Sequence, residues 1–412
     1  MPSILLFFDF ELTIILKLMT MDLSLYIHIP FCVRKCRYCD FYSVPVGDLS
    51  FAGDVSLVNQ YIDALSLEWE SYENSGITDG KVLRTVYLGG GTPSILDIDM
   101  WGRLNEKLFS RIDKSGIMEW SIECNPESFS IDKARMYAES GVTRLTFGVQ
   151  SLNTRELSIC GRAHGAERAR EVLGYNCLND LFDSIGVDII YALPGQTANS
   201  LDGTLLSILS IPAIKHLSAY ELTIANDTPF GRHKKILPLP PEESSANMYE
   251  LINGRCTERG MVQYEVSNYA LPGHESIHNK AYWSHTPYIG LGASAHSYIH
   301  PKRWSNTANV NRYISALLSP SNISYQNAVD FEEYINQQEL SKEIIFLGLR
   351  NISGIDENNF AARTGVSLRA DGRGEFLRKY VDSGLLKRSG SKWIPSSKGM
   401  LFADMMAREL MV

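Results

Sequence analysis

Three cysteines lie within eight residues of the chain, in the stretch YIHIPFCVRKCRYCDFYS. Cys32, Cys36 and Cys39 follow the spacing C-x3-C-x2-C. A structural zinc site needs four ligands, and His28 is the local candidate for the fourth, four residues before Cys32. A disulfide would use two thiols and leave the third without a partner. The remaining cysteines are single and distant in sequence: Cys124, Cys160, Cys177 and Cys256.

An iron–sulfur cluster explains three neighbouring thiols better than zinc does. Such clusters are held by thiolates, normally four of them. Three thiolates on a four-iron cluster leave one iron free for a small molecule that chelates through amino and carboxylate groups. Tyr38, directly before Cys39, makes the spacing more specific. The stretch therefore favours iron–sulfur over zinc.

Two further segments carry polar or glycine residues where a predicted strand ends. YLGGGTPSIL contains Gly90, Gly91 and Thr92, and SIECNPES contains Glu123. The glycines are explained by a tight loop that needs positive φ, and Glu123 by a solvated surface position. At the C-terminal mouth of a barrel, however, such a loop lets backbone approach a ligand, and a carboxylate can hold a ribose diol.

Three other residues follow later predicted strands. Gln150 lies in TFGVQSLN, Arg162 in CGRAH, and Asp188 in GVDIIYALPGQT. Each has an ordinary explanation when it is taken alone. Arg162 could be a surface charge, and Asp188 could be a buried structural acid.

The cysteine motif after a first strand, with its aromatic residue, resembles that of radical S-adenosylmethionine (SAM) proteins. The resemblance implies a [4Fe-4S] cluster on Cys32, Cys36 and Cys39, with SAM on the remaining iron. In that superfamily an electron from the cluster cleaves SAM to a 5′-deoxyadenosyl radical. The resemblance also assigns the amino-acid end of SAM to the glycine loop, at Gly90, Gly91 and Thr92, and the ribose to Glu123.

From about residue 24 to residue 300, and more weakly to the end, the motifs are similar to one subfamily. It comprises the oxygen-independent coproporphyrinogen III oxidase (dehydrogenase) and its heme-chaperone relative. The similarity implies that Tyr26 contacts the cluster-bound SAM. It further implies a second SAM pocket formed by Tyr38, Gln150, Arg162 and Asp188, so that one or two SAM molecules bind.

The same motifs divide this subfamily. The dehydrogenase typically has an extra cysteine two positions after the last cluster ligand, where this chain has Phe41, and a longer arm before the first strand. The resemblance therefore favours the heme-chaperone branch, whose members bind heme and pass it to an acceptor protein. The resemblance does not specify which protein accepts the heme, and the class of acceptors includes membrane-associated proteins. The alternative is radical decarboxylation of coproporphyrinogen III to protoporphyrinogen IX.

Histidines gather near the segment HNKAYWSHTPYIGLGASAHSY. Five of the nine histidines lie there or beside it: His274, His278, His285, His296 and His300. Heme iron takes His or Tyr as an axial ligand, and aromatic rings line flat apolar groups. These residues also pack readily as polar core. His278 and Tyr282 are the first candidates for heme ligands, and Lys280 and Arg303 are candidates for partners of the heme propionates.

The elements that must position these residues alternate along the chain. We expect strands at 24–29, 82–88, 118–126, 142–151, 183–195 and 216–224, and helices at 59–72, 100–112, 131–140, 168–176 and 200–210. This alternation predicts an α/β fold, a partial parallel (β/α)6 TIM-like barrel. Three short helices, a hairpin at LLKRSGSKWIPS and a closing helix predict a winged-helix-like α+β domain at the C-terminus.

Four parts are expected along the chain: an extension over 1–21, the radical SAM barrel over 22–225, a less regular cavity wall over 226–335, and the winged-helix-like domain over 336–412. Residues 1–21 are interpreted either as sequence upstream of the true start or as a disordered, loosely packed extension.

Composition narrows the class of protein. The net charge of −8 argues against a general nucleic-acid binder, so we expect no nucleic-acid partner. Seven cysteines, an odd number with three clustered, favour a reducing cytoplasm over a secreted disulfide scaffold. The apolar N-terminus is broken by Asp9, Glu11 and Lys17, so neither a signal peptide nor stable membrane insertion is predicted.

Overall fold

A computed structural model of the chain describes residues 22–47, 49, 54–319 and 321–411. The predicted extension over residues 1–21 lies outside the described residues. Among the described helices, none combines the length and the apolar character that crossing a membrane requires.

The core of the fold is one twelve-stranded sheet in the order β14-β13-β12-β11-β1-β4-β5-β6-β7-β8-β10-β9. Its central run consists of parallel strands in chain order, and β1 does not pair with β8, so this run is an open, partial barrel. The prediction of six parallel strands is confirmed. They are β1 (Asp22–Ile29), β4 (Val82–Gly90), β5 (Glu119–Cys124), β6 (Arg144–Gln150), β7 (Ser184–Tyr191) and β8 (Ile214–Glu221).

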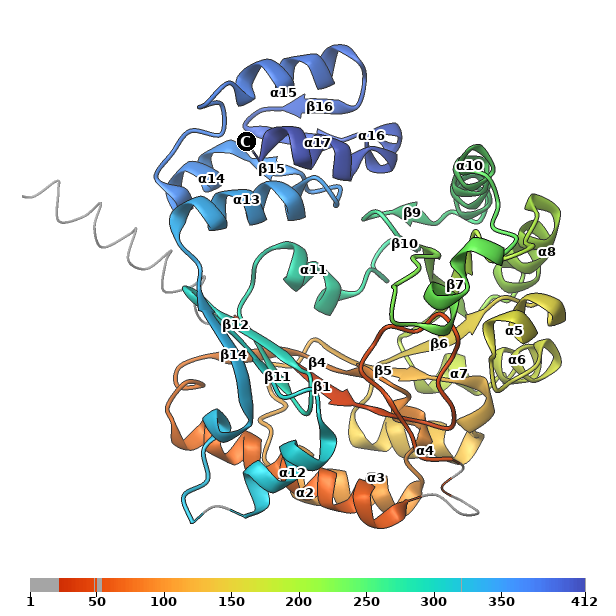
Figure 1. The fold of residues 1–412 in the computed structure, drawn as a ribbon, viewed down its shortest axis with the longest axis vertical. Helices are drawn as coiled ribbons and strands as arrows, with labels where there is room; N and C mark the ends of the chain where they lie inside the picture. Colours follow the sequence, from red (N-terminus) through yellow and green to blue (C-terminus); the bar gives the residue numbers. More distant parts are fainter. Residues whose placement is uncertain (1–21, 48, 50–53, 320, 412) are drawn as a thin grey trace, which may run out of the picture.

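Helices connect the parallel strands and cover the sheet on its outer side (Figure 1). Local signals set their ends: α4 begins after Ser130, whose hydroxyl accepts from the Lys133 amide, and ends at Gly141 in the left-handed conformation. The helix expected at 100–112 is instead α3 followed by a π-helical turn at Asn105–Phe109. The helices are α2 (Val55–Asn74), α3 (Ile98–Leu104), α4 (Ile131–Ser140), α5 (Thr154–Cys160), α6 (Ala166–Leu173), α7 (Leu178–Leu181) and α8 (Ala198–Leu209).

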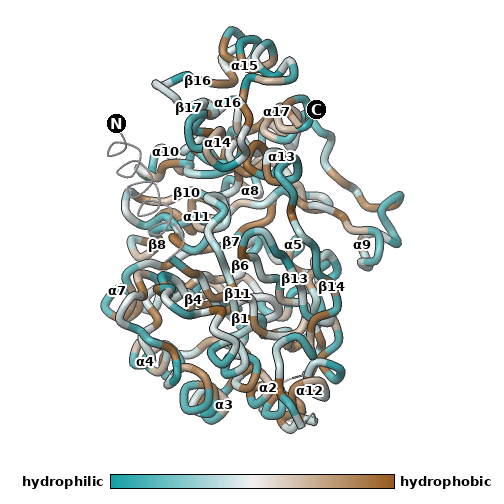
Figure 2. Tube along the Cα trace, turned by 90° about the vertical axis from the view of Figure 1, so that its left-hand side faces the viewer, coloured by the Kyte–Doolittle hydropathy of each residue, from teal (hydrophilic) through white to brown (hydrophobic). Residues whose placement is uncertain are grey.

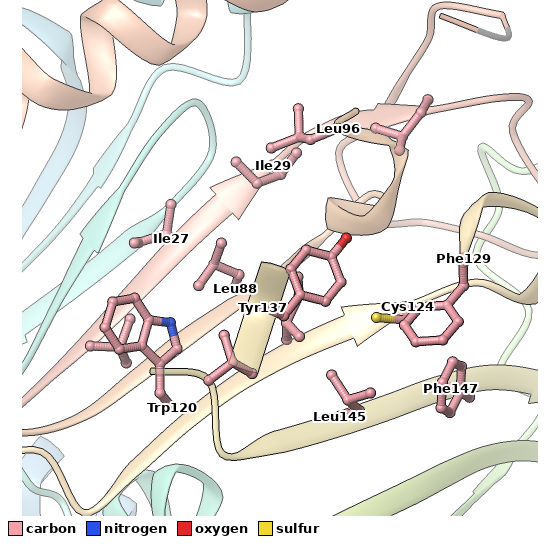
Figure 3. Close-up of a cluster of buried hydrophobic side chains, with 14 of the residues drawn as sticks. Ile27, Ile29, Leu88, Leu96, Trp120, Cys124, Phe129, Tyr137, Leu145 and Phe147 are labelled. Carbon is pink, nitrogen blue, oxygen red and sulfur yellow. The ribbon is translucent and has the colours of Figure 1, made fainter. Parts of the chain in front are cut away.

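Alternation along the strands separates an apolar outer face from a polar inner face. Tyr26 of β1 pairs with Tyr87 of β4, and Glu123 of β5 pairs with Thr146 of β6, so these side chains point to the inner face. The residues before and after each of them on its strand point to the outer face. Figure 3 shows the outward side chains packed against one another: Ile27, Leu88, Trp120, Cys124, Leu145 and Phe147, together with Phe129 and Tyr137 from the connecting segments. Along α3 and α4 hydrophobic and hydrophilic residues alternate (Figure 2), as expected of helices that bury one side.

The part expected to be a less regular cavity wall is more ordered than predicted. β11 (Tyr288–Leu291) pairs in parallel with β1, and an antiparallel meander continues from it: β12 (His296–Ile299), β13 (Lys302–Asn306) and β14 (Val329–Tyr334). On the far edge β10 (Asn268–Ala270) and β9 (Val262–Gln263) extend the sheet beyond β8. The helices of this part are α9 (Pro229–Arg232), α10 (Glu242–Glu258), α11 (Ile277–Trp283) and α12 (Val310–Leu318).

One buried carboxylate ties this added edge to the barrel. Glu68 on α2 is 0 % exposed. Its oxygens accept from the Gly292 amide at 2.9 Å, from Asn306 Nδ2 at 2.6 Å and from the Tyr313 hydroxyl at 2.5 Å. Because these donors come from the loop after β11, from β13 and from α12, a single side chain holds three separate segments.

The C-terminal part has its own hydrophobic cluster, which includes Phe360, Leu377 and Trp393. Its order of elements is that of the predicted winged helix, except that the closing helix is divided at Phe402. A two-residue strand, β15 (Ile355–Asp356), joins the hairpin. The other elements are α13 (Gln337–Gly348), α14 (Glu357–Thr364), α15 (Arg373–Asp382), β16 (Leu386–Ser389), β17 (Lys392–Pro395), α16 (Ser397–Leu401) and α17 (Ala403–Leu410). The exact four-part division of the chain stays a prediction.

We predict that Glu68→Ala destabilises the protein by about 3 kcal/mol, because three buried donors lose their acceptor. Glu70→Ala on the same helix removes a partly exposed partner of Arg111 and should cost less than about 1 kcal/mol. Urea unfolding of both variants measures the difference. Equal losses would show that the Glu68 carboxylate does not hold the added edge.

Candidate functional site

A cavity of about 360 Å³ opens at the C-terminal ends of the parallel strands. This is the edge of the sheet where barrel proteins place their ligands. Every predicted cluster or SAM residue except Tyr26 lines it: Cys32, Cys36, Tyr38, Cys39, Gly90, Gly91, Thr92, Glu123, Gln150, Arg162 and Asp188. Residues from five successive strands (β1, β4, β5, β6 and β7) and their loops therefore meet at one place. We call it the cluster cavity.

The cysteines lie on the loop that follows β1. Cys32 ends the two-residue strand β2 (Phe31–Cys32), which pairs with β3 (Val44–Pro45), so the two ends of the loop are held together. In its middle, the Arg37 amide donates to the Cys160 carbonyl at 2.9 Å. All three thiols are partly exposed to the cavity.

Hydrogen-bond donors face two of the three sulfur atoms. Thr92 Oγ1 lies 3.5 Å from Cys32 Sγ, and Arg162 Nη1 lies 3.5 Å from Cys36 Sγ. Burial raises the pKa of the Cys39 thiol to about 11, and bound iron would supply the positive charge that ionises such a thiol. Partly exposed thiols, sulfur-directed donors and a shared cavity fit an iron–sulfur cluster.

Within the described residues, no group of three His, Cys, Asp or Glu side chains is placed to hold a single metal ion. Zinc requires its ligands to converge on one point, whereas the thiolates of a cluster each bind a different iron.

The glycine loop is shaped by close packing against β1. Gly90 has φ 108°, and a Cβ at this position would lie 2.3 Å from the His28 ring. The next two amides, of Gly91 and Thr92, donate to the carbonyls of Ile29 and Phe31 at 2.9 and 2.8 Å. Only glycine meets both demands at position 90, and the loop lines the cavity.

Glu123 is fixed by two hydrogen bonds from β4. The Tyr87 hydroxyl donates to Oε1 at 2.8 Å, and the Gly90 amide donates to Oε2 at 3.1 Å. Burial raises the pKa of this carboxyl group. The carboxylate is therefore held rigidly at the cavity wall rather than solvated, which removes the ordinary explanation given for it from the sequence.

Arg162 connects the cluster loop to the strands. It is 8 % exposed, and its Nη2 donates to the Gly148 carbonyl at 2.6 Å and to Asn125 Oδ1 at 2.7 Å. Asn125 in turn donates to Thr92 Oγ1 at 3.0 Å. A buried guanidinium beside sulfur makes the cavity electropositive near Cys36, so a surface-charge explanation of Arg162 is excluded.

Asp188 and Gln150 complete the cavity on β7 and β6. Asp188 Oδ1 has no hydrogen-bond partner among the described residues, and burial raises the pKa of its carboxyl group from 3.8 to about 7. Gln150 has φ 68°, at a register shift between β6 and β7. A non-glycine residue with positive φ is uncommon, and such positions gather at ligand sites. An unpaired buried oxygen is a place for a ligand donor.

Tyr26 lies instead on a second cavity of about 360 Å³, together with the predicted heme residue Tyr282. His278, the other heme candidate, is 1 % exposed, and neither of its ring nitrogens is free. Nδ1 lies 2.8 Å from Thr85 Oγ1, and Nε2 lies 3.0 Å from the Tyr282 hydroxyl. The structure therefore brings Tyr26 and Tyr282 together and keeps His278 behind them, on the side of β4.

The sequence analysis missed two residues that organise the cluster cavity, Asn125 in its wall and Tyr87 behind Glu123. Tyr87 fixes Glu123, and Asn125 joins Arg162 to Thr92. Asn125 directly follows β5, and a polar residue at the end of a parallel strand is a signal that could have found it. Tyr87 carries no such signal, because only the register of β4 against β5 places it beside the carboxylate.

Comparison with known proteins agrees with this geometry. The family model of the radical SAM superfamily matches residues 26–208, and that of the HemN C-terminal domain matches residues 335–402. The structure of coproporphyrinogen III oxidase (HemN) from Escherichia coli has the same fold, with a TM-score of 0.77 over 97 % of this chain and 92 % of the other, at 22 % identity. Fold and cavity together define a radical SAM protein.

Relatives at the sequence level are more specific. The heme chaperone HemW of Bacillus subtilis is 35 % identical over 393 residues, which cover 92 % of this chain and 97 % of the relative. HemW of Lactococcus lactis is also 35 % identical, over 81 % of this chain and 82 % of the relative. The chain belongs to the HemW family, the heme-chaperone branch of the HemN-like radical SAM proteins.

We predict that Cys36→Ala, and equally Cys32→Ala or Cys39→Ala, abolishes the absorption of the reconstituted protein near roughly 400 nm, where thiolate-bound iron absorbs. Cys177→Ala is the matched control, because Cys177 is also partly exposed but lies outside the cavity. Absorption spectra and iron content after anaerobic reconstitution test this. A full cluster in any of the three variants would contradict the assignment.

A second prediction concerns pH. The folded state raises the pKa of Asp188 from 3.8 to about 7, so it binds this proton more tightly than the unfolded chain does. The contribution of Asp188 to the free energy of unfolding of the ligand-free protein therefore falls as pH rises from about 4 to 7. Asn cannot ionise, so Asp188→Asn should match wild type at pH 4 and be more stable by roughly 1–4 kcal/mol at pH 8.

Urea unfolding at both pH values measures this difference. Asp202→Asn, at a partly exposed residue paired with Arg255, serves as the control for a general effect of charge removal. A stability difference between Asp188→Asn and wild type that is the same at pH 4 and pH 8 would contradict the raised pKa.

Proposed function

We propose that this protein is a heme chaperone, which binds heme and a SAM-ligated [4Fe-4S] cluster and transfers heme to an acceptor protein. The observation that carries the proposal is the similarity to curated heme chaperones over nearly the whole chain, at 35 % identity. Phe41, at the position where the dehydrogenase relatives typically have a further cysteine, supports the same branch.

The cluster cavity would hold the cluster and SAM. Cys32, Cys36 and Cys39 bind the cluster in this proposal, and when both groups are bound the cluster supplies one-electron chemistry to SAM. The glycine loop at residues 90–92, which lines the cavity, receives the amino-acid end of SAM in this proposal. Glu123, already oriented by two donors of β4, accepts from the ribose hydroxyls.

The opposite wall suits a second SAM molecule. Tyr38, Gln150, Arg162 and Asp188 line it, and the unpaired Oδ1 of Asp188 offers an acceptor for an amino or hydroxyl group. Tyr26 lies beside Tyr87, whose hydroxyl holds Glu123, so Tyr26 can support the first SAM from behind.

Heme is placed in this proposal beside α11, on the side of the sheet where Tyr282 lines a cavity. His278 and Tyr282 stay predictions as iron ligands, and Lys280 and Arg303 as partners of the propionates. The acceptor is a protein of unspecified class, including membrane-associated ones. The seven cysteines are all free thiols, which suits a reducing cytoplasm as the place of action.

A second candidate function is the decarboxylation of coproporphyrinogen III. The specific observation in its favour is the fold shared with HemN over nearly the full length of both chains. Both functions would use the same cluster cavity, so the cavity alone does not distinguish them. An assay for protoporphyrinogen and an assay for heme delivery distinguish the two functions.

We predict that the reconstituted full-length protein binds hemin and delivers it to an apo-peroxidase, restoring peroxidase activity. In parallel, protein with a verified cluster is given SAM, reductant and coproporphyrinogen III under anaerobic conditions. The amount of protoporphyrinogen formed should not exceed the amount formed by the Cys36→Ala variant, because a heme chaperone does not decarboxylate the porphyrinogen.

Free hemin at the same concentration is the control for unassisted transfer. If the protein does not bind hemin, the proposed heme-chaperone function is refuted. Product well above the Cys36→Ala level would establish the decarboxylase instead.

A further inference from the structure

Two basic segments lie at the edge of the cluster cavity. Residues 34–41 of the cysteine loop line it, and residues 227–236, which include α9 and the 3₁₀ turn after it, pack against that loop. Together the two segments carry two exposed acids, Asp40 and Asp227, and six exposed cations, although the net charge of the chain is −8. The cations are Arg34, Lys35, Arg37, Arg232, Lys234 and Lys235. We call these two segments the basic rim.

The two segments of the basic rim are fixed to each other and to the barrel. The Phe230 amide donates to the Arg37 carbonyl at 3.0 Å. The Phe230 ring is buried in a small apolar cluster to which Tyr38 of the cysteine loop belongs. Just beyond the second segment, the Gly195 amide donates to the Pro238 carbonyl at 2.7 Å. The cations therefore stand on a supported surface.

The cations of the basic rim have no acidic partners within the described part of the chain. Lys35, Arg37 and Arg232 donate to main-chain carbonyls, and none of the six cations forms an ion pair there. Elsewhere on the surface arginines are paired with carboxylates, as Arg111 is with Glu70. A local excess of unpaired positive charge attracts a partner of opposite charge and speeds its association.

Exposed apolar side chains lie on the same two segments. Ile236 is 78 % exposed and Phe41 is 66 % exposed, the two highest values for large apolar side chains among the described residues. Apolar anchors surrounded by charged residues are typical of protein interfaces. The interspersed acids Asp40 and Asp227 would be repelled by an anionic lipid surface. The basic rim therefore fits a protein that presents carboxylates around an apolar patch.

The place of the basic rim indicates which protein this is. Phe41 lines the cluster cavity and also the second cavity, where Tyr282 lies. A protein docked over Phe41 would stand at the mouth of both cavities. In the proposed function heme lies on the side of Tyr282, so the protein that must come close to this mouth is the one that receives the heme.

We propose that the basic rim is the docking surface for the heme acceptor, and that the acceptor presents an acidic face to it. This rests on the proposed heme-chaperone function and adds the place and the charge of its partner. The cations speed the encounter, and Ile236 and Phe41 pack against the docked acceptor. Because salt screens the attraction between exposed charges, delivery by this route slows as ionic strength rises.

The test compares the rates of hemin transfer to two forms of one apo-peroxidase, followed by the recovery of peroxidase activity. One form is unmodified, and the other has succinylated lysines, which make its surface acidic, and takes up free hemin at an unchanged rate. Wild type should deliver hemin faster to the acidic form at low ionic strength. The double variant Lys234→Glu, Lys235→Glu should slow this transfer by about tenfold or more. Salt at roughly 0.5 M should remove most of the difference.

The double variant Lys387→Glu, Lys398→Glu is the matched control, because it makes the same change of charge at exposed lysines of the C-terminal part. It should transfer hemin as wild type does. Lys234 and Lys235 line neither the cluster cavity nor the cavity of Tyr282, so hemin affinity and cluster absorption should stay unchanged in both double variants. Transfer from both variants to the unmodified apo-peroxidase should match that of wild type.

The outcomes separate this inference from the function on which it rests. If wild type binds or delivers no hemin, the heme-chaperone proposal itself fails. If wild type delivers hemin without preference for the acidic form, or if both double variants slow delivery equally, the chaperone proposal stands and the docking surface is wrong.

Two further probes identify another occupant of the basic rim. These are vesicles of phosphatidylglycerol and phosphatidylcholine, and reduced flavodoxin as an acidic electron carrier. If the Lys234→Glu, Lys235→Glu variant delivers hemin normally but loses vesicle binding, the surface meets a membrane and the inference is overturned. Normal delivery together with slower reduction of the cluster by flavodoxin would overturn it in favour of an electron carrier.

Discussion

The structure depends on the register of its parallel strands. In a parallel ladder each strand is locked to its neighbour, and successive side chains point to opposite faces. The pairs Tyr26–Tyr87 and Gly148–Asp188 place residues of neighbouring strands on the same inner face. A slip of one residue in any strand would move its polar side chain into the apolar layer of Figure 3. The site is therefore a consequence of the same pairing that buries the core.

That constraint also explains why the inner face tolerates charge. Glu123 and Asp188 are carboxyl groups with little access to water, and each would be costly without partners. Glu123 has its donors on β4, while Arg162 brings a positive charge to the same cavity from the loop after α5. Asp188 keeps one oxygen unpaired and holds its proton more tightly than usual. This oxygen of Asp188 lies in the wall of the cavity that a ligand would enter. A buried oxygen without a partner at such a place is expected of a binding site rather than of a packing defect.

The sequence was informative where function needs a local pattern. The cysteine spacing, the glycine run and the polar residues at strand ends depend on a few consecutive positions, and all of them met in one cavity. The edge strands β11 to β14 were not predicted, because they are short and β11, the first of them, pairs with β1, more than two hundred and fifty residues earlier in the chain. Tyr87 has the same difficulty, because its role follows from a contact with Glu123 on the neighbouring strand, which no local pattern records. The fold buries His278 and gives both of its ring nitrogens hydrogen-bond partners, and its assignment as a heme ligand stays a prediction.

The two cavities are connected by one loop, whose residue Phe41 lines both of them. The loop that carries the cysteines also carries Phe41, and it is held at its ends by β2 and β3 and in its middle by the backbone of Cys160. A loop pinned in this way cannot reorient Cys39 without moving the ring two residues away. A shift of Cys39 would therefore also move Phe41, which lines both cavities.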